Sequence, residues 1–193
     1  MSNYLKAIFA GGCFWCTEST FAKVSGVIEV LPGYIGDEAY NANYDAVSTG
    51  RTKHYEAIEI TYDPDKVSYE QLLEVFWREI DPTDPDGQFA DKGPQYKSAI
   101  FYTTEAERFL AEASKKALEE SKRFSKPIVT EILLAKEFYV AETYHCRYYE
   151  KNSQHYKMYR KGSGREDFLK QAWGDDLDKT NTLLRGLKNL FIG

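Results

Sequence analysis

Residues 55–62, YEAIEITY, alternate between two faces, and Glu56 shares its face with Ile58, Ile60 and Tyr62. This period of two predicts a half-buried strand. A helix follows, because Ser68 and Gln71 form a capping-box pattern ahead of apolar residues at helical spacing: Tyr69, Leu72, Leu73, Phe76, Trp77 and Ile80. The turn DPTDPDG, 81–87, ends it. A half-buried strand beside an amphipathic helix favours a sheet covered by helices.

Other short segments extend this pattern along the chain. Strands are predicted at 4–9, at 27–31 (ended by Pro32-Gly33), at 97–103 and at 128–134. One helix is predicted near Cys13, with one face formed by Phe14, Phe21 and Val24. Thr104 with Glu107 caps another, whose apolar face we assign to Ala106, Phe109, Leu110, Ala113 and Ala117. The order is not a regular βαβ array, so we expect an α+β fold, a two-layer sandwich of a mixed sheet with flanking helices.

Three segments carry weaker patterns. Residues 36–53 are polar and aperiodic, and loops of that length are often functional. Residues 140–164 are polar and rich in tyrosine, and we predict irregular structure there. Beyond Arg165, helical pieces are suggested by Phe168, Leu169, Trp173, Leu183, Leu184, Leu187 and Leu190. We therefore divide the chain into a catalytic domain, 1–160, and a C-terminal extension packed on it, 161–193, to which no function is assigned.

Charge and hydropathy exclude several function classes. The chain has 25 basic and 30 acidic residues, net −5, so it lacks the basic footprint of a nucleic-acid-binding protein. No Lys/Arg run suggests a membrane surface, and the apolar stretches are far too short to cross a bilayer. The N-terminal segment has Lys6 inside its only apolar run and lacks a signal-peptide core. We expect a soluble, cytoplasmic protein with no nucleic-acid or membrane partner.

The segment GGCFWC carries the strongest chemical signal. Two glycines let the backbone turn from a strand into a helix, so that Cys13 lies at the helix N-terminus. The free N–H groups and the dipole there favour a thiolate, which predicts a Cys13 pKa below the usual value of about 8.5. Cys16 follows one turn later on the same face, placed to attack an oxidised Cys13. The spacing predicts redox chemistry.

Three other interpretations of the cysteine pair stay open. Two thiols in a helix can simply be buried core residues. They can form half of a zinc site, with Cys146 and either His145 or His155 as further ligands, although no second CxxC or HxxxH is present. A thioredoxin-like thiol–disulfide oxidoreductase also places CxxC at a helix start. Such proteins usually carry small residues or proline between the cysteines, where this chain has Phe-Trp, and have shorter chains.

The neighbours of the pair suggest a pocket. Phe14 is in register with Phe21 and is by default a core residue, whereas Trp15 lies off that stripe and is expected to line a pocket. The 15 tyrosines also supply hydrogen-bond donors for a pocket with a polar base. Glu56, directed inward among apolar side chains, should be desolvated, with a raised pKa that favours the acid form. The alternative for Glu56 is an edge residue whose carboxyl reaches solvent.

At this point the sequence resembles the A-type peptide methionine sulfoxide reductases. GGCFWCTES matches their GCFW signature, and similar segments follow in the same order at 32–64, 76–102 and 141–152. The resemblance implies a ferredoxin-like core and repair of oxidative damage by reduction of the S epimer of methionine sulfoxide, free or in proteins. In that family a cysteine attacks the sulfur, methionine leaves, and the resulting sulfenic acid is converted to a disulfide. Thioredoxin or a similar reductant regenerates the enzyme, without metal or cofactor.

The same resemblance implies roles for the residues that match the family motifs. Cys13 matches the nucleophile, and Phe14 and Trp15 match the pair that holds the substrate methyl group. Glu56, in KHYE, matches the general acid that protonates the sulfoxide oxygen.

Two tyrosines and an aspartate complete the matched site. Tyr44, in NANYD, and Tyr96, in DKGPQY, match residues that would donate hydrogen bonds to the same oxygen. Asp91 is expected to orient a water or the substrate backbone, although it could equally be a simple turn residue.

The chain departs from the family pattern in its cysteines. Many members resolve the sulfenic acid with a cysteine near the C-terminus, but here no cysteine follows Cys146. Cys16 is therefore the expected resolving residue. Cys146 occupies the position of a glutamine in the family and is either a second recycling cysteine or a bystander thiol.

Overall fold

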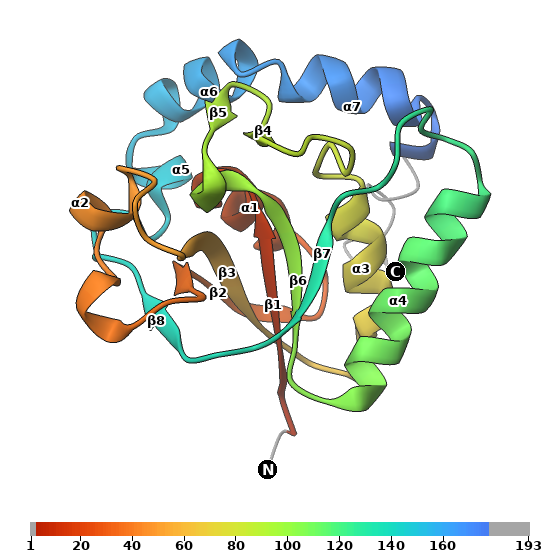
Figure 1. The fold of residues 1–193 in the computed structure, drawn as a ribbon, viewed down its shortest axis with the longest axis horizontal. Helices are drawn as coiled ribbons and strands as arrows, with labels where there is room; N and C mark the ends of the chain where they lie inside the picture. Colours follow the sequence, from red (N-terminus) through yellow and green to blue (C-terminus); the bar gives the residue numbers. More distant parts are fainter. Residues whose placement is uncertain (1–2, 178–193) are drawn as a thin grey trace, which may run out of the picture.

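The computed structural model describes residues 3–177, and its centre is a six-stranded mixed sheet (Figure 1). The strand order is β7-β6-β1-β3-β2-β8, and only β6 and β7 run parallel. The strands are β1 Leu5–Gly11, β2 Val27–Ile35, β3 Tyr55–Tyr62, β6 Ser98–Tyr102, β7 Glu131–Leu134 and β8 Phe138–Val140. The mixed sheet confirms the predicted α+β class.

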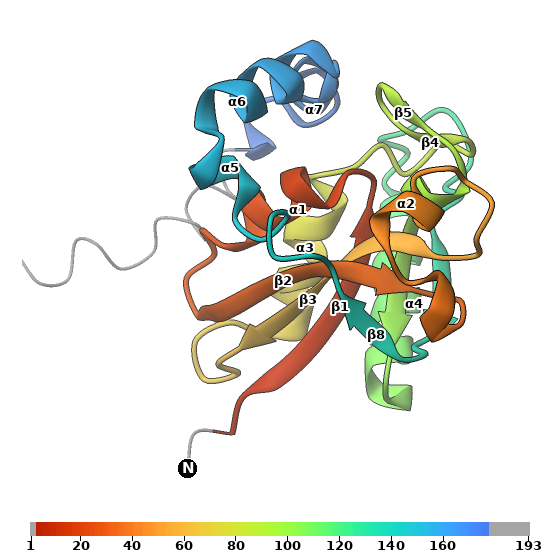
Figure 2. The same ribbon diagram turned by 90° about the vertical axis from the view of Figure 1, so that its left-hand side faces the viewer.

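The central part of the molecule has ferredoxin-like connectivity. Along the chain the order is β1, α1 (Phe14–Phe21), β2, β3, α3 (Tyr69–Trp77) and β6, while in space β6 and β3 flank β1 and β2 follows β3. Helices α1 and α3 pack on one face of the sheet (Figure 2). Both capping-box hydrogen bonds between Ser68 and Gln71 are present at the start of α3.

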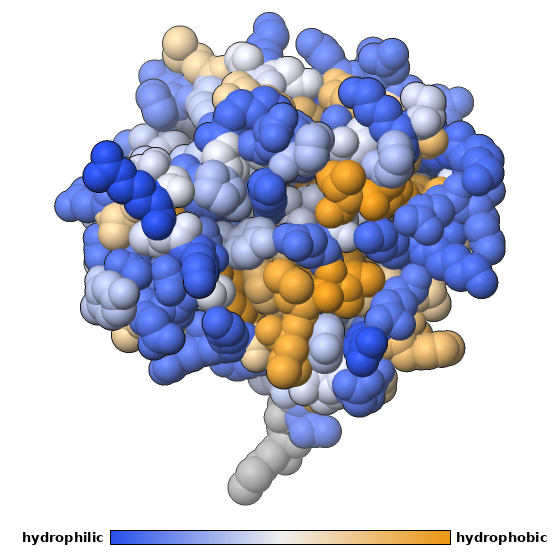
Figure 3. Space-filling view, viewed as in Figure 1, coloured by the Kyte–Doolittle hydropathy of each residue, from blue (hydrophilic) through white to orange (hydrophobic). Residues whose placement is uncertain are grey.

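The main core lies between the sheet and these helices. Phe9 of β1 contacts Phe21, Tyr69 and Phe76, with ring centroids 5.0 to 6.0 Å apart, and all four side chains are buried. A smaller apolar cluster occupies the other face of the sheet: Ile8, Ala10, Ile35, Ala57, Ala99 and Phe101. Figure 3 shows further apolar side chains at the surface on the side where β6 and β7 lie. The helical side is the more completely covered face of the sandwich.

The predicted end of the second strand at Pro32 is wrong. Strand β2 continues to Ile35, and Pro32 pairs with Ile58 of β3. Its carbonyl accepts a hydrogen bond from the Ala141 N–H at 2.9 Å, on the β8 side. In an antiparallel strand the N–H and C=O of one residue point to the same neighbouring strand. The N–H that Pro32 lacks would therefore face β8, at the end of the β2–β8 ladder, where its loss breaks no hydrogen bond to β3.

Most of the apolar face assigned to the fourth helix is also wrong, since only Leu110 of the five residues packs against the core. Helix α4, Glu105–Glu120, begins after Thr104 as predicted, but it buries Ala111 and Leu118. Phe109 is 70% exposed. The buried face continues through Ser114, whose hydroxyl accepts a hydrogen bond from the Trp77 indole. The inward face therefore includes a partly buried serine with satisfied hydrogen bonds, which a count of apolar residues does not detect.

Residues 140–164 are more ordered than predicted. They include α5, Tyr148–Lys151, and α6, Ser153–Gly162, and α7 follows at Arg165–Trp173. The inward side of α6 consists of Tyr156, Tyr159 and Arg160. Because these residues carry polar groups, a search for apolar residues at helical spacing does not predict the helix. The leucines at 183, 184, 187 and 190 lie outside the described residues.

Short elements surround the end of the sheet where β1 turns into α1. They are η1 Ala39–Asn41, α2 Tyr44–Val47, β4 Gly87–Gln88, β5 Asp91–Lys92 and η2 Pro94–Tyr96. These elements bring segments far apart in sequence to one edge of the molecule. Between residues 3 and 177, no helix has the length and apolar character needed to span a bilayer.

Candidate active site

The turn from β1 into α1 positions Cys13. Gly12 has a φ of +83°, and a Cβ on it would lie 2.6 Å from the Cβ of Gln88, so the turn requires glycine on both counts. Gln88 is fixed in turn, because its amide bonds both the N–H and the carbonyl of Asp81 at 2.8 Å. Cys13 is the N-cap of α1, as predicted, and only 6% of it is exposed.

The predicted low pKa of Cys13 is wrong. Burial raises the pKa of Cys13 well above its usual value, and the neighbouring Cys16 and Glu56 act in the same direction. The first N–H of α1, on Phe14, donates to the Glu56 carboxyl at 3.1 Å rather than to the cysteine. Because burial disfavours the thiolate, the resting Cys13 carries a proton.

Cys16 has the opposite tendency. The thiol of Cys13 donates to its sulfur and lowers the pKa of Cys16 to about 7, and the charges of Arg165 and Arg160 reinforce the effect against burial. The three cysteines are free thiols in this structure. Of the pair at the helix start, Cys16 is therefore the more acidic.

Glu56 has the environment that the strand pattern predicted. It lies on β3, is 2% exposed, and faces the N-terminus of α1. Burial raises the pKa of Glu56 to about 8, although the Phe14 N–H opposes the shift. The alternative of a solvent-reaching edge residue is excluded, and at neutral pH the carboxyl holds a proton that it can donate.

Tyr44 and Tyr96 face the same centre from two different elements. Tyr44 begins α2 and Tyr96 ends η2. Burial raises the pKa of both phenols, and the charges of Glu56 and Cys13 raise both further. Both hydroxyls therefore stay protonated and can donate hydrogen bonds. Asp91, at the start of β5, is brought to this centre too, and burial raises the pKa of its carboxyl.

The two aromatic residues between the cysteines lie in different surroundings. Phe14 is 1% exposed and packs against Tyr34 and His145. Trp15 is half-buried, stacks on Tyr148 with centroids 3.9 Å apart, and donates its indole N–H to Nδ1 of His145 at 3.1 Å. The predicted difference between a core Phe14 and a less buried Trp15 is present.

Sequence reasoning missed three residues that hold the site together. The Tyr159 hydroxyl on α6 bonds the Asp91 carboxylate and hydrogen-bonds Cys13. Glu142 accepts hydrogen bonds from the Tyr44 N–H and the Tyr34 hydroxyl, both at 2.8 Å, and His145 holds Trp15. Glu142 and His145 belong to the segment 141–152, which matched the family motifs and could have indicated them, whereas Tyr159 lies outside the matched segments.

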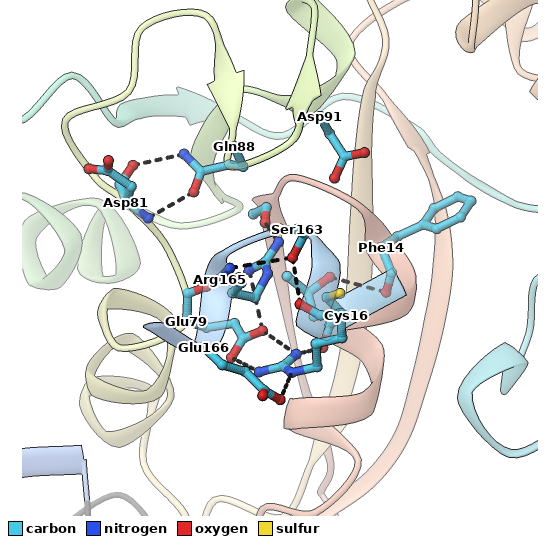
Figure 4. Close-up of polar contacts among 12 residues, drawn as sticks. Phe14, Cys16, Glu79, Asp81, Gln88, Asp91, Ser163, Arg165 and Glu166 are labelled. Atoms are coloured by element: carbon cyan, nitrogen blue, oxygen red, sulfur yellow. Dashed lines mark hydrogen bonds and ion pairs between the residues drawn. The ribbon is translucent and has the colours of Figure 1, made fainter. Parts of the chain in front are cut away.

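A buried ionic cluster lies on the Cys16 side of the turn (Figure 4). Arg165 and Arg160 both pair with Glu79, at 3.3 and 2.9 Å. Arg165 also donates to the carbonyl of Gly11, two residues before Cys13, at 3.1 Å. The sequence assigned no chemistry to residues from 165 onward, because a lone arginine after a polar stretch gives no signal of burial.

Cys146 lies apart from the other cysteines. It borders a groove of about 370 Å³ together with Glu18, and neither Cys13 nor Cys16 lines that groove. Burial raises the pKa of the Cys146 thiol, with the Glu18 carboxylate adding to the shift. Over residues 3–177 no group of three or more His, Cys, Asp or Glu side chains is arranged to hold a metal ion.

A buried thiol pair that faces a protonated carboxyl, with tyrosine hydroxyls around it, is the site of a thiol-dependent reductase. A family model described as peptide methionine sulfoxide reductase matches residues 5–177. The chain belongs to this family.

Individual relatives agree with that membership. The chain is 52% identical over 169 residues to the peptide methionine sulfoxide reductase MsrA of Halalkalibacterium halodurans, covering 88% of this chain and 96% of the relative. Two solved structures are similar at 30% identity. Reduced Mxr1 of Saccharomyces cerevisiae matches with a TM-score of 0.74, over 78% of this chain and 87% of Mxr1. Methionine sulfoxide reductase A of Corynebacterium diphtheriae matches with 0.69, over 79% and 77%.

These findings confirm the predicted class of enzyme. The chain is an oxidoreductase that reduces methionine sulfoxide. They also decide against the thioredoxin-like disulfide oxidoreductase, because both the family model and the fold match reductases of methionine sulfoxide.

Proposed function

We propose that the chain reduces the S epimer of methionine sulfoxide, free or in proteins, with Cys13 as nucleophile and Glu56 as general acid. The observation that carries this proposal is the Glu56 carboxyl, buried against the N-terminus of α1 beside Cys13 with its pKa raised to about 8. A group of this acidity is protonated at neutral pH yet releases its proton readily, and general acids of this kind contribute about 10²- to 10⁴-fold in rate.

In the first step the substrate is held by both sides of the site. Phe14 and Trp15 hold the methyl group, while Tyr44 and Tyr96 donate hydrogen bonds to the sulfoxide oxygen. The Cys13 sulfur attacks the sulfoxide sulfur as Glu56 protonates the oxygen. This attack forms a bond between the two sulfurs. The new S–S bond and the S–O bond of the substrate then break as the hydroxyl moves to the Cys13 sulfur, so that methionine leaves and Cys13 is left as a sulfenic acid. The thiol proton of Cys13 restores the acid form of Glu56, so protons balance.

Asp91 takes a supporting role in this proposal. Its carboxylate accepts the Tyr159 hydroxyl, which also bonds Cys13. Asp91 and Tyr159 together orient the sulfur and a water or the substrate backbone beside it.

In the second step Cys16 attacks the sulfenic acid. A bond forms between the two cysteine sulfurs, the S–O bond of Cys13 breaks, and the oxygen leaves as water. The lowered pKa of Cys16 favours this step, since the thiolate is the attacking form. Cys146 is the second candidate for this role, but it borders a different groove.

The disulfide then requires an external thiol, and no organic cofactor or metal takes part in the proposed cycle. We assign this step to thioredoxin or a similar dithiol protein in the cytoplasm, where cysteines between turnovers remain reduced. Mxr1 of Saccharomyces cerevisiae has been solved in complex with Trx2, which agrees with a partner of this type.

A single-turnover assay tests the proposal. The chain is mixed, without reductant, with the S or the R epimer of an N-blocked methionine sulfoxide. Methionine is quantified, and the remaining thiols are mapped by alkylation and mass spectrometry. We expect methionine from the S epimer alone, with a disulfide between Cys13 and Cys16. Loss of the two thiols without methionine would instead identify a disulfide exchanger.

A further inference from the structure

The ionic cluster beside Cys16 has an unusual depth. Arg165 is 1% and Glu79 3% exposed, and Arg165 donates to the Glu79 carbonyl at 2.5 Å as well as to its carboxylate. Arg160 makes two hydrogen bonds to the same carboxylate, at 2.9 and 3.2 Å, and one to the Cys16 carbonyl at 3.5 Å. The cluster thus connects α6 and α7 to the first turn of α1.

The buried charges of this cluster do not cancel. Two guanidinium groups share one buried carboxylate, that of Glu79. Two further acids are nearby. Glu166 contacts Arg160 at 3.5 Å from the surface, with 58% of its side chain exposed. Arg165 also acts on the Asp91 carboxylate, which is bonded by the Tyr159 hydroxyl and not by either arginine. Within the described chain, Nε of Arg165 is buried without a hydrogen-bond partner. Buried charges in proteins are normally paired, so the cluster favours one further anion in its neighbourhood.

Cys16 is the group placed to supply that anion. The titratable groups that act on it come from five directions: Cys13 on its own turn, Glu56 on β3, Glu79 after α3, Tyr156 and Arg160 on α6, and Arg165 on α7. Glu56 is protonated at neutral pH and Tyr156 is neutral there, its pKa raised by burial to about 12. The charged groups that remain are two arginines and one glutamate.

We propose that Arg165, supported by Arg160, is a positioning residue that makes Cys16 the leaving sulfur when a dithiol reductant opens the Cys13–Cys16 disulfide, so that the reductant becomes bonded to Cys13. The inference rests on the proposed function, in which Cys16 forms that disulfide.

The chemistry of exchange gives the direction of attack. A thiolate of the reductant bonds to Cys13 Sγ, the S–S bond breaks, and its electron pair leaves on Cys16 as a thiolate. The second thiol of the reductant then attacks its own sulfur in the mixed disulfide, and Cys13 leaves and is protonated. The more acidic thiol leaves faster in such exchanges. Access agrees, since Cys13 is 6% and Cys16 1% exposed.

Trapping the mixed disulfide tests the direction. The Cys146→Ser chain is oxidised and mixed with a thioredoxin that retains only its attacking cysteine. The complex is then digested and mapped by mass spectrometry. We expect the thioredoxin on Cys13 and a free thiol at Cys16. Thioredoxin on Cys16, or equal amounts on both, would overturn the proposal. The disulfide is also made with diamide, so the mapping remains decisive even where sulfoxide reduction fails.

Two substitutions test the role of Arg165. Arg165→Met removes the positive charge. Arg165→Lys retains the charge but replaces the planar guanidinium group with an ammonium group. In the Cys146→Ser background, we expect Arg165→Met to slow formation of the trapped complex about threefold to tenfold and Arg165→Lys to restore most of the rate. Thiolate absorbance against pH, measured in chains that keep Cys16 alone, should shift to higher pH in Arg165→Met and remain near its original position in Arg165→Lys.

Arg123→Met is the matched control. Arg123 also holds α7, through the Ala172 carbonyl at 2.8 Å and the Trp173 ring at 4.4 Å, but it does not act on Cys16. The Arg123→Met substitution therefore removes the same charge as Arg165→Met and loosens the same helix, α7. If Arg165→Met and Arg123→Met trap the complex at the same rate, Arg165 is only a structural residue. If Arg165→Met does not fold, Arg165→Lys and the mapping in the Cys146→Ser chain still decide the direction of attack.

Discussion

The two sides of the first turn of α1 differ in their chemistry although they are one helical turn apart. On the Cys13 side lie groups that hold protons at neutral pH, the Glu56 carboxyl and the hydroxyls of Tyr44 and Tyr96. On the Cys16 side lie guanidinium groups held by a single buried carboxylate. The first environment donates protons to a departing oxygen, and the second stabilises a sulfur anion.

This difference shows how one CxxC segment can divide two tasks. Proximity alone would let either sulfur attack, resolve or leave. The surroundings distinguish them, because burial beside Glu56 raises the pKa of Cys13 while a donated hydrogen bond and the arginines lower that of Cys16. Each prediction below removes one contribution to this difference.

Cys13→Ser should have the largest effect. A serine hydroxyl is a poor nucleophile toward the sulfoxide sulfur and cannot form a disulfide, so no methionine should form in a single-turnover assay without reductant. Cys146→Ser, treated identically, is the control. Measurable methionine from Cys13→Ser would move the nucleophile away from the Glu56 side and contradict the proposed mechanism.

Glu56→Gln should slow the first step by about 10²- to 10⁴-fold, the usual contribution of a general acid. The amide keeps the shape and can remain near the Phe14 N–H, but it has no proton to give. In the unchanged chain the acid form is present below the pKa of about 8, so the rate should decline as pH rises through that value. The decline should vanish in Glu56→Gln. Rapid-quench measurement of methionine from pH 6 to about 10 gives both results, and an unchanged rate would make Glu56 structural.

Cys16→Ser separates the two halves of the cycle. Because Cys13 alone carries out the first step, a single methionine per enzyme should still form, and the sulfenic acid should then persist. Multiple turnover with thioredoxin should be lost. The measurement compares the methionine burst with the steady-state rate in the same sample. Sustained turnover in Cys16→Ser would show that Cys146 resolves the sulfenic acid.

The sequence predicts the acidic side of the turn better than the cationic side. The alternation in 55–62 placed Glu56 inward with Ile58 and Ile60, and the structure confirms both its burial and its raised pKa. Strands β1, β2, β3, β6 and β7 and helices α1, α3 and α4 follow from periodicity and capping, whereas β4, β5 and β8 were not predicted. The ferredoxin-like core follows from the resemblance. Roles for Tyr44 and Tyr96 rest on the resemblance too, since 15 tyrosines carry no positional signal of their own.

The cationic side could not be predicted because its inward faces are polar. Arg165, Arg160 and Tyr159 are long side chains whose tips are satisfied inside the protein, and such faces do not differ in pattern from solvated ones. The error on Cys13 has a related cause. A helix N-terminus lowers a thiol pKa only when its N–H groups and dipole outweigh burial, and here the Phe14 N–H serves a carboxyl from a distant strand.

Cys146→Ser should have the smallest effect and sharpens the comparison by removing the third thiol. Cys146 borders the groove with Glu18, on neither side of the Cys13–Cys16 turn, and burial raises the pKa of its thiol. A thiol that is mostly protonated, in a groove lined by neither Cys13 nor Cys16, contributes little to exchange. Steady-state turnover with thioredoxin should therefore change by less than about twofold, within the range of a neutral substitution. A larger fall in turnover, together with a disulfide to Cys146 in the unchanged chain, would contradict this. It would mean that the disulfide passes from Cys16 to Cys146 before the reductant opens it.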